Sequence, residues 1–143
     1  MEASVNFSYE TNFRLQGAQK EYSDWIDRVV RSEGFELGEV TYVFCDDEYL
    51  LGINQEYLNH DTFTDIITFD YTQGSHVSAD IFISVERVEE NAKTFKVSFN
   101  QELLRVMVHG TLHLMKYNDK VEEDVVEMRS KEEEKIKMFH VER

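Results

Sequence analysis

The stretch NQELLRVMVHGTLHLMKY, residues 100–117, is the most hydrophobic helix-like segment of the chain. Its apolar side chains recur at intervals of three and four residues, which predicts a helix with one buried face. The predicted buried stripe consists of Leu104, Met107, Val108, Thr111, Leu112 and Met115. We expect the helix to end at Tyr117 and Asn118, because Asn tolerates the left-handed backbone that closes many helices.

The segments on either side of this helix contain further strand and helix patterns. Alternating or β-branched and aromatic runs predict strands at 4–10, 38–46, 64–71 and 77–85, with a turn or loop at 72–76. Helical spacing predicts further helices at 17–35, 46–59, 85–95 and 121–139. Because strands and helices mix without strict βαβ alternation, we predict an α+β fold with a mixed sheet of about four strands and helices packed on it.

Some of these segments carry specific expectations of burial. The strand at 64–71 should be buried, because it is rich in β-branched and aromatic residues. The helix at 46–59 should turn four side chains inward: Tyr49, Leu50, Ile53 and Tyr57. The last helix should bury Val125, Met128, Ile136 and Phe139.

The composition is that of a globular protein. With 143 residues, of which 41% are hydrophobic, the chain suits a single domain spanning residues 1–143. No apolar run approaches the length that crosses a bilayer, and the start MEASVNFSYETNF does not resemble a secretory signal, so we expect no membrane partner. Cys45 is the one cysteine and cannot form an internal disulfide, which fits a reduced cytoplasmic location.

The charge of the chain is strongly negative but uneven. A formal net charge of −14 argues against a dedicated high-affinity nucleic-acid binder, because phosphate contacts need Lys and Arg. It fits basic partners, or a charge that maintains solubility. The interval from residue 93 to 120 is nevertheless locally basic, since its acidic residues are only Glu102 and Asp119. Its cations are candidate RNA contacts: Lys93, Lys96, Arg105, Lys116 and Lys120.

Two histidines on the central helix form a candidate metal site. His109 and His113 are four residues apart, so both imidazoles lie on one helix face and can point to one ion. A catalytic zinc site typically has three protein ligands and one open position, so one further protein ligand remains to be identified. Asp119 is the natural third ligand if the chain folds back after the helix. Gly110 leaves space for a backbone to come close.

A less specific interpretation accounts for the same residues. The histidines could be incidental, and Asp119 could cap the next helix, because Glu122 three residues later completes a capping box. The protease motif H-E-x-x-H places a glutamate beside the first histidine, where this chain has Gly110. The spacing therefore suits zinc, but the catalytic carboxylate of the protease is missing.

Three blocks of the sequence together resemble a known family. The stretch HGTLHLMKYND, residues 109–119, resembles the motif H-G-x-L-H-L-x-G-Y-D-H of the YbeY-type bacterial rRNA maturation factors. Residues 53–71, INQEYLNHDTFTDIITFDY, resemble that family's L-N-x-x-Y-R-x-x-D-x-x-T-D-V-L-S-F segment. Residues 79–92, ADIFISVERVEENA, resemble its G-D-I-x-I-S stretch and the helix that follows. The resemblance covers most of the chain and keeps the order and spacing of the blocks.

The resemblance implies a function for the chain. It implies a zinc-dependent endoribonuclease that acts in maturation of small-subunit ribosomal RNA and in ribosome biogenesis. One zinc ion, or another divalent metal, would be held by His109, His113 and Asp119 on and after the helix near the C-terminus. The partners would be ribosomal RNA and ribosomal proteins of the small subunit.

The sequence departs from the family pattern at four positions. Asp119 replaces the third histidine, and a carboxylate can also ligate zinc. Lys116 replaces the motif glycine, so the turn before Asp119 cannot rely on a glycine. Leu58 replaces an arginine that is thought to matter for the RNA chemistry, which leaves nuclease competence open. Ala79 replaces a glycine, which is a milder change.

Several polar residues are candidates for supporting roles. His60 and Asp61, in a polar loop, are candidate catalytic bases or simply exposed loop residues. Asp65 and Asp80 match family aspartates and could orient a ligand histidine or serve as turn or edge residues. Glu132 falls on the apolar side of the last helix. A buried glutamate needs a partner, for which we consider Arg105, Arg129 or a ligand histidine.

Two other functions stay open at this stage. A non-catalytic ribosome assembly factor would use its acidic surface to bind basic ribosomal proteins, and both the charge and Leu58 favour it. A zinc hydrolase of another substrate, such as a peptide, is the third possibility. Gly110 in place of a catalytic glutamate counts against that third function.

Overall fold

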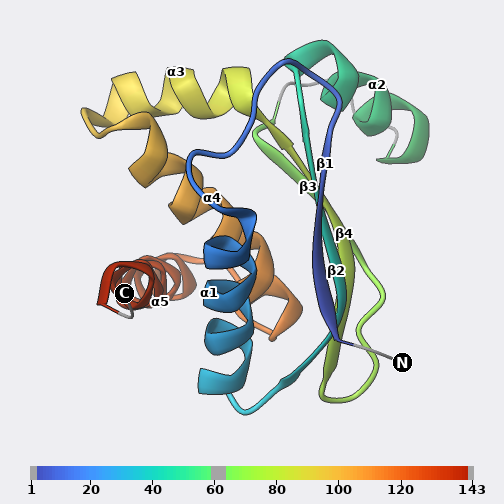
Figure 1. Cartoon of the computed structure of the whole chain (residues 1–143). Helices are drawn as coiled ribbons and strands as arrows, with labels where there is room; N and C mark the ends of the chain where they lie inside the picture. The colour runs from blue at the N-terminus through green and yellow to red at the C-terminus, as the bar shows by residue number, and fades with distance from the viewer. Residues whose placement is uncertain (1–2, 59–63, 142–143) are drawn as a thin grey trace.

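Four strands and five helices make up the part of the chain that the computed structural model describes, residues 3–58 and 64–141 (Figure 1). The strands are β1 (Ser4–Tyr9), β2 (Glu36–Cys45), β3 (Ile66–Asp70) and β4 (His76–Ser84). The helices are α1 (Gln19–Ser32), α2 (Asp47–Leu58), α3 (Val85–Phe95), α4 (Phe99–Leu114) and α5 (Glu122–Val141). The predicted α+β class is therefore confirmed, and every predicted strand and helix is present.

The strands form one mixed sheet in the order β1-β2-β4-β3. β1, β2 and β4 run parallel, and β3 pairs antiparallel with β4 at the edge. The turn predicted at 72–76 joins β3 to β4, and Gly74 within it has a φ of +58°, which glycine adopts without strain. The pattern thus combines a parallel β1-α1-β2 unit with a hairpin, which explains the absence of strict βαβ alternation.

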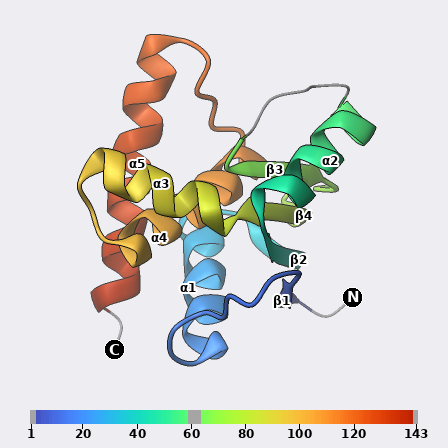
Figure 2. The ribbon, with the colours of Figure 1, turned by 90° about the horizontal axis from the view of Figure 1, so that it is seen from above.

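Helices cover the two faces of the sheet unequally. α1 and α4 pack on one face, and α5 lies across their outer side, so that this side has three layers (Figures 1 and 2). Alternate residues of the central strands, among them Tyr42, Phe44 and Ile81, enter the main core on this side. α4 is buried along most of its length, and the whole stripe predicted for it is buried. No helix in the described ranges has the length and apolarity that crossing a membrane requires.

The opposite face of the sheet is covered in part by α2. A small cluster of Cys45, Leu50 and Ile67 is buried there. The prediction that Tyr49 and Tyr57 point inward is wrong, since they are 41% and 64% exposed. Their rings lie against Phe82 and Phe69 and leave their other sides in solvent.

Two further predictions of burial need correction. The strand predicted as buried is β3, of which only Ile67 is fully buried, because β3 lies at the edge of the sheet that the described residues form. Val125 is 39% exposed, because α5 contacts the molecule along one side while its first turns extend beyond that contact (Figure 2). Met128 and Phe139 are buried as predicted, and Ile136 is partly buried.

A glycine allows α4 to lie close to the sheet. A Cβ atom built on Gly110 would lie 2.8 Å from Ile66 Cδ1 and 3.4 Å from Ile81 Cγ2. The expected close approach is therefore present, but it is made by isoleucine side chains of the sheet and not by a backbone. It places the neighbouring His109 next to the sheet edge formed by β3.

A second glycine fixes the start of β2, where the register with β4 shifts between Leu37 and Val40. A Cβ at Gly38 would collide with Ser78 Oγ and lie 2.9 Å from the carbonyl oxygen of Val77. We predict that Gly38→Ala lowers the free energy of unfolding by about 1–3 kcal/mol, because backbone has to move. Urea titration of the purified variant measures this change.

The matched control is Gly52→Ala in the interior of α2, where a Cβ meets nothing within 4 Å. It should raise the free energy of unfolding by about 1 kcal/mol, because Ala is the better helix former. A Gly38→Ala variant as stable as the wild type would contradict the close approach at the β-bulge.

Candidate metal centre

The last two turns of α4 bring the two histidines together. The rings of His109 and His113 lie edge to face with centroids 4.6 Å apart, and their Nε2 atoms are 3.1 Å apart. This is the arrangement predicted from their spacing of four residues. Both side chains are partly buried.

Asp119 completes the group from the segment after the helix. Its Oδ2 atom lies 3.2 Å from His109 Nε2 and 3.3 Å from His113 Nε2. Ligands at about 2.0–2.2 Å from a tetrahedral zinc ion are separated by about 3.4 Å, so this donor set fits such an ion. The three residues form a group that could hold a metal ion. Asp119 does not begin the next helix, since α5 starts at Glu122.

The His109 ring is oriented from behind by a buried glutamate of α5. His109 Nδ1 lies 2.6 Å from Glu132 Oε2, and the Glu132 side chain is 2% exposed. Because a carboxylate only accepts, Nδ1 carries the proton and Nε2 is left with a free lone pair. A histidine of this kind is prepared for a metal, since carboxylate partners of Nδ1 fix the tautomer and raise the basicity of the other nitrogen.

The His113 ring is oriented in a similar way by the backbone. Its Nδ1 atom donates to the carbonyl oxygen of Tyr117 at 2.8 Å. Nε2 of this ring therefore also carries the lone pair. The two histidines have different partners but present the same atom to the same point.

The chain reverses direction just after His113. α4 ends at Leu114, three residues earlier than predicted, and Lys116 has a φ of +77°. The left-handed residue is thus Lys116, at the position of the family glycine, rather than Asn118. Hydrogen bonds from the Lys116 and Tyr117 amides to the carbonyl oxygens of His113 and Leu112 close the helix end.

Arg105 stands behind the centre in a group of carboxylates. Its guanidinium donates to both oxygens of Glu102 at 2.6 and 3.0 Å and to Glu132 at 3.4 Å, and it lies 3.9 Å from Asp65. Burial alone would lower the pKa of Arg105, but its bonds with Glu102 and the surrounding carboxylates raise it above its usual range. Burial also raises the pKa of Asp65.

This group carries an excess of negative charge. The guanidinium faces three carboxylates, and Asp119 adds a fourth on the other side of the His109 ring, so the formal charge is −3 with neutral histidines and ionised carboxylates. A divalent cation bound beside Asp119 would offset two of these charges.

Two of the partners considered for Glu132 are present, namely a ligand histidine, His109, and Arg105. Asp65 does not contact a ligand ring. It accepts a hydrogen bond from Asn91 and lies near Arg105.

Some predicted site residues lie elsewhere. Asp80 lies on the sheet face opposite α4, because it alternates with the core residues Ala79 and Ile81, and it accepts a hydrogen bond from Tyr71 at 3.3 Å. Its predicted role beside a ligand histidine is therefore wrong. His60 and Asp61 lie outside the described residues.

The predicted basic patch is not continuous. Lys93 and Lys96 lie before α4, and Lys116 and Lys120 lie after it; a helix of 16 residues separates them by about 24 Å. Arg105, between them, is 17% exposed and enclosed by carboxylates, so it cannot serve as a free phosphate contact. The exposed cations form two separate pairs.

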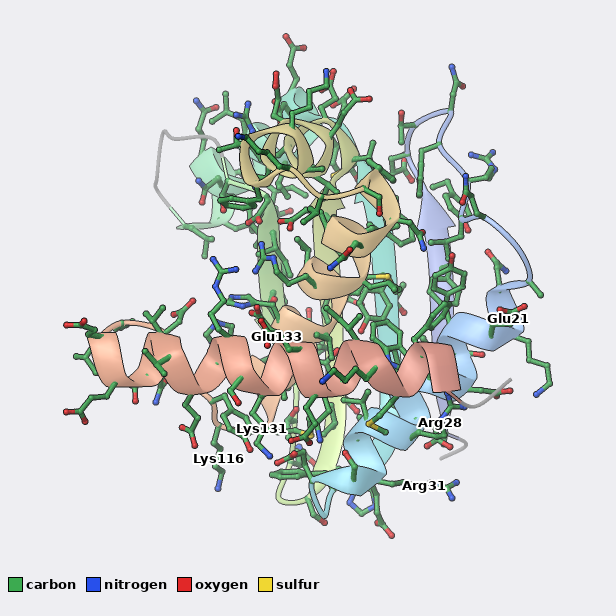
Figure 3. The ribbon with its side chains drawn as sticks, turned by 90° about the vertical axis from the view of Figure 1, so that its left-hand side faces the viewer. Glu21, Arg28, Arg31, Lys116, Lys131 and Glu133 are labelled. Atoms are coloured by element: carbon green, nitrogen blue, oxygen red, sulfur yellow. The ribbon has the colours of Figure 1, made fainter. Side chains whose placement is uncertain are left out.

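One part of the site could not be predicted from the sequence. The Tyr117 hydroxyl donates to Glu33 Oε1 at 2.7 Å, and Glu33 Oε2 pairs with Lys135 at 2.7 Å and with Lys131 at 3.2 Å. Glu33 directly follows α1, and both lysines belong to α5. Figure 3 shows Lys131 and Lys116 on the same side of the α5 ribbon. These side chains connect the segment that carries Asp119 to two distant helices.

The fold and this donor set define an α+β protein with a candidate metal centre at the end of a buried helix. The chain belongs to the family described as endoribonuclease YbeY, whose model matches residues 5–140. It is 60% identical over 138 residues to the endoribonuclease YbeY of Flavobacterium johnsoniae, which covers 96% of this chain and 99% of that protein. The corresponding protein of Flavobacterium psychrophilum is 53% identical, with coverage of 96% and 97%.

A solved structure supports the same fold. The solution structure of TM1509 from Thermotoga maritima matches with a TM-score of 0.66 over 94% of this chain and 88% of that one. The two sequences are 24% identical, so this likeness concerns the fold alone.

Lys116 provides a test of the turn that places Asp119. A non-glycine residue in the left-handed region costs roughly 1–2 kcal/mol. We predict that Lys116→Gly raises the free energy of unfolding by about 0.5–1 kcal/mol, after the greater entropy of glycine in the unfolded chain is subtracted. Lys120→Gly, at a residue without positive φ, should give no increase in the free energy of unfolding, which urea titration measures. Equal effects of both substitutions would contradict the left-handed turn.

Glu33 provides a test by pH. Burial would raise its pKa, but hydrogen bonds from Lys135, Tyr117 and Lys131 outweigh burial and lower the pKa to about 2. The folded-state pKa lies below the unfolded value, so this carboxylate stabilises the fold above about pH 4.5, and the contribution is lost as the pH falls toward 2. Glu33→Gln should cost about 3 kcal/mol at pH 7 and progressively less below pH 4.5.

Urea titrations of this variant and the wild type across that pH range measure the difference. Glu39→Gln, an exposed residue of β2, is the control and should change stability little at any pH. A Glu33→Gln deficit that stays constant down to pH 2.5 would contradict the ion pair.

Proposed function

We propose that this chain is a zinc-dependent endoribonuclease that acts in maturation of small-subunit ribosomal RNA and in ribosome biogenesis, in the cytoplasm. Membership of the endoribonuclease YbeY family supports cleavage of RNA. The observation that carries the metal dependence is the convergence of three donor atoms, with both histidines bonded through Nδ1 so that both Nε2 atoms face Asp119.

Some residues of the site would bind the cation, and others orient the residues that bind it. His109, His113 and Asp119 would hold one zinc ion, or another divalent metal. When bound, zinc acts as a Lewis acid on a phosphoryl oxygen or lowers the pKa of its water to about 7. Glu132 and the Tyr117 carbonyl orient the two rings. The 2′-hydroxyl of RNA is an alternative nucleophile. His60 and Asp61 stay sequence-based candidates for the general base.

The exposed cations that flank the third ligand suit a phosphate backbone. Lys116 and Lys120 are exposed on either side of Asp119, so RNA at the centre would meet both. Lys93 and Lys96 lie beyond the other end of α4 and would contact only a substrate that follows the helix. We propose the pair next to Asp119 as the primary RNA contacts.

Removal of one ligand tests the metal and the reaction together. His109→Ala and His113→Ala should each lose the bound metal on dialysis, measured by elemental analysis. Cleavage of ribosomal RNA fragments in zinc buffer should fall on the order of 100-fold or more. His76→Ala is the matched control, because His76 is an exposed histidine that pairs with Glu36 at the far end of β4. A dialysed His109→Ala protein that keeps one zinc per chain would refute the ligand assignment.

A second candidate function rests on a different observation. Between Arg31 and Arg87 the sequence contains no Lys or Arg and twelve acidic residues. This part of the chain also exposes Tyr49, Tyr57 and Tyr71. Acidic and aromatic side chains together suit a basic protein partner, because Arg pairs with carboxylates and stacks on aromatic rings. A non-catalytic assembly factor that binds basic small-subunit ribosomal proteins would use this surface and would cut no RNA with saturating zinc.

The peptide hydrolase is less well supported. The position at which zinc proteases carry their catalytic glutamate is Gly110, which faces Ile66 and Ile81 across a close contact. A longer side chain there would enter the core rather than reach a substrate.

A further inference from the structure

Asp119 is the one proposed ligand that no helix or strand holds. It lies between the end of α4 at Leu114 and the start of α5 at Glu122. The last backbone hydrogen bond back to α4 comes from the Tyr117 amide. Residues 118–120 make no backbone–backbone hydrogen bond to another described residue. Some other contact must therefore fix the place of Asp119 relative to the histidines.

Tyr117 is the residue at which this segment is anchored. Its hydroxyl donates to Glu33 Oε1 at 2.7 Å. The other oxygen of Glu33 is held by Lys135 at 2.7 Å and by Lys131 at 3.2 Å, and Lys131 Nζ lies 5.9 Å from the centre of the Tyr117 ring. The Lys135 side chain is 1% exposed, so the acceptor of the tyrosine is fixed by a buried ion pair between α1 and α5.

The same tyrosine contacts a proposed ligand through its backbone. The Tyr117 carbonyl accepts the Nδ1 proton of His113 at 2.8 Å. A displacement of Tyr117 would therefore rotate the His113 ring and, two residues on, move the Asp119 carboxylate. Tyr117 thus contacts one proposed ligand directly and lies two residues before another.

We propose that Tyr117 is a positioning residue whose bond to Glu33 sets the affinity of the centre for its metal, an inference that rests on the proposed metal site. Tyr117 does not touch the ion or the substrate in this role. Loss of a group that orients metal ligands typically costs 10–100-fold in metal affinity. Loss of the Tyr117 hydroxyl should reduce metal affinity by an amount in the lower part of that range, because it acts through the segment that it anchors.

The test compares Tyr117→Phe with a matched tyrosine. Tyr9→Phe is the control, because the Tyr9 hydroxyl makes a hydrogen bond of the same length, 2.7 Å, to Gln19 at the opposite edge of the sheet. Zinc affinity is measured by competition with a chromophoric chelator, and stability by urea titration. Absorption of the cobalt-substituted proteins reports the coordination geometry.

Tyr117→Phe should bind zinc about 10-fold more weakly than the wild type and shift the cobalt spectrum. Tyr9→Phe should lose stability without a change of zinc affinity or spectrum. Glu33→Asp, which keeps the charge beside Lys135 but shortens the reach to the hydroxyl, should weaken zinc binding in the same direction as Tyr117→Phe.

Zinc affinity of both Tyr117→Phe and Glu33→Asp within twofold of the wild type would overturn the inference while the metal site stands. A wild-type chain that binds no zinc would instead overturn the proposed function, so the two failures are distinguishable. Equal losses of affinity in Tyr117→Phe and Tyr9→Phe would make the effect one of general stability and would also overturn the inference.

Discussion

The hydrogen bond between His109 Nδ1 and the buried Glu132 carboxylate is the contact on which the rest of the centre depends. A carboxylate that is 2% exposed needs strong partners, and Glu132 pairs with His109 and Arg105. The bond fixes the proton on Nδ1 and turns Nε2 toward His113 and Asp119. The tautomer that a metal needs is therefore a consequence of how α5 packs on α4.

α5 supports both histidines of the centre, by different routes. Glu132 reaches His109 directly, whereas Lys131 and Lys135 hold Glu33, which holds Tyr117 and through it His113. Figure 3 shows α5 crossing in front of α4, with Lys131 and Glu133 on opposite edges of the helix. A helix that is largely polar in sequence thus contributes some of the most important contacts of the site.

Much of the fold and the two histidine ligands could be predicted from the sequence, because they depend on local periodicity, whereas Asp119 follows from its place just after the helix. Apolar spacing along α4 predicted both its buried stripe and the common face of His109 and His113. The wrong predictions concern the arrangement of segments in space. Local patterns do not show which strand forms the edge of the sheet, or whether cations separated by a helix can share a surface. The face of Asp80 could have been read from its alternation with Ala79 and Ile81. The bond between Tyr117 and Glu33 could not, since these residues are 84 positions apart and Glu33 belongs to no motif.

Diffraction from zinc-soaked crystals, recorded at wavelengths above and below the zinc absorption edge, tests the central claim most directly. The account predicts one anomalous peak per chain, at about 2.0–2.2 Å from His109 Nε2, His113 Nε2 and an Asp119 carboxylate oxygen, with Glu132 still bonded to His109 Nδ1. A map in which these three side chains point apart with no peak between them, or in which zinc binds at other residues, would contradict it.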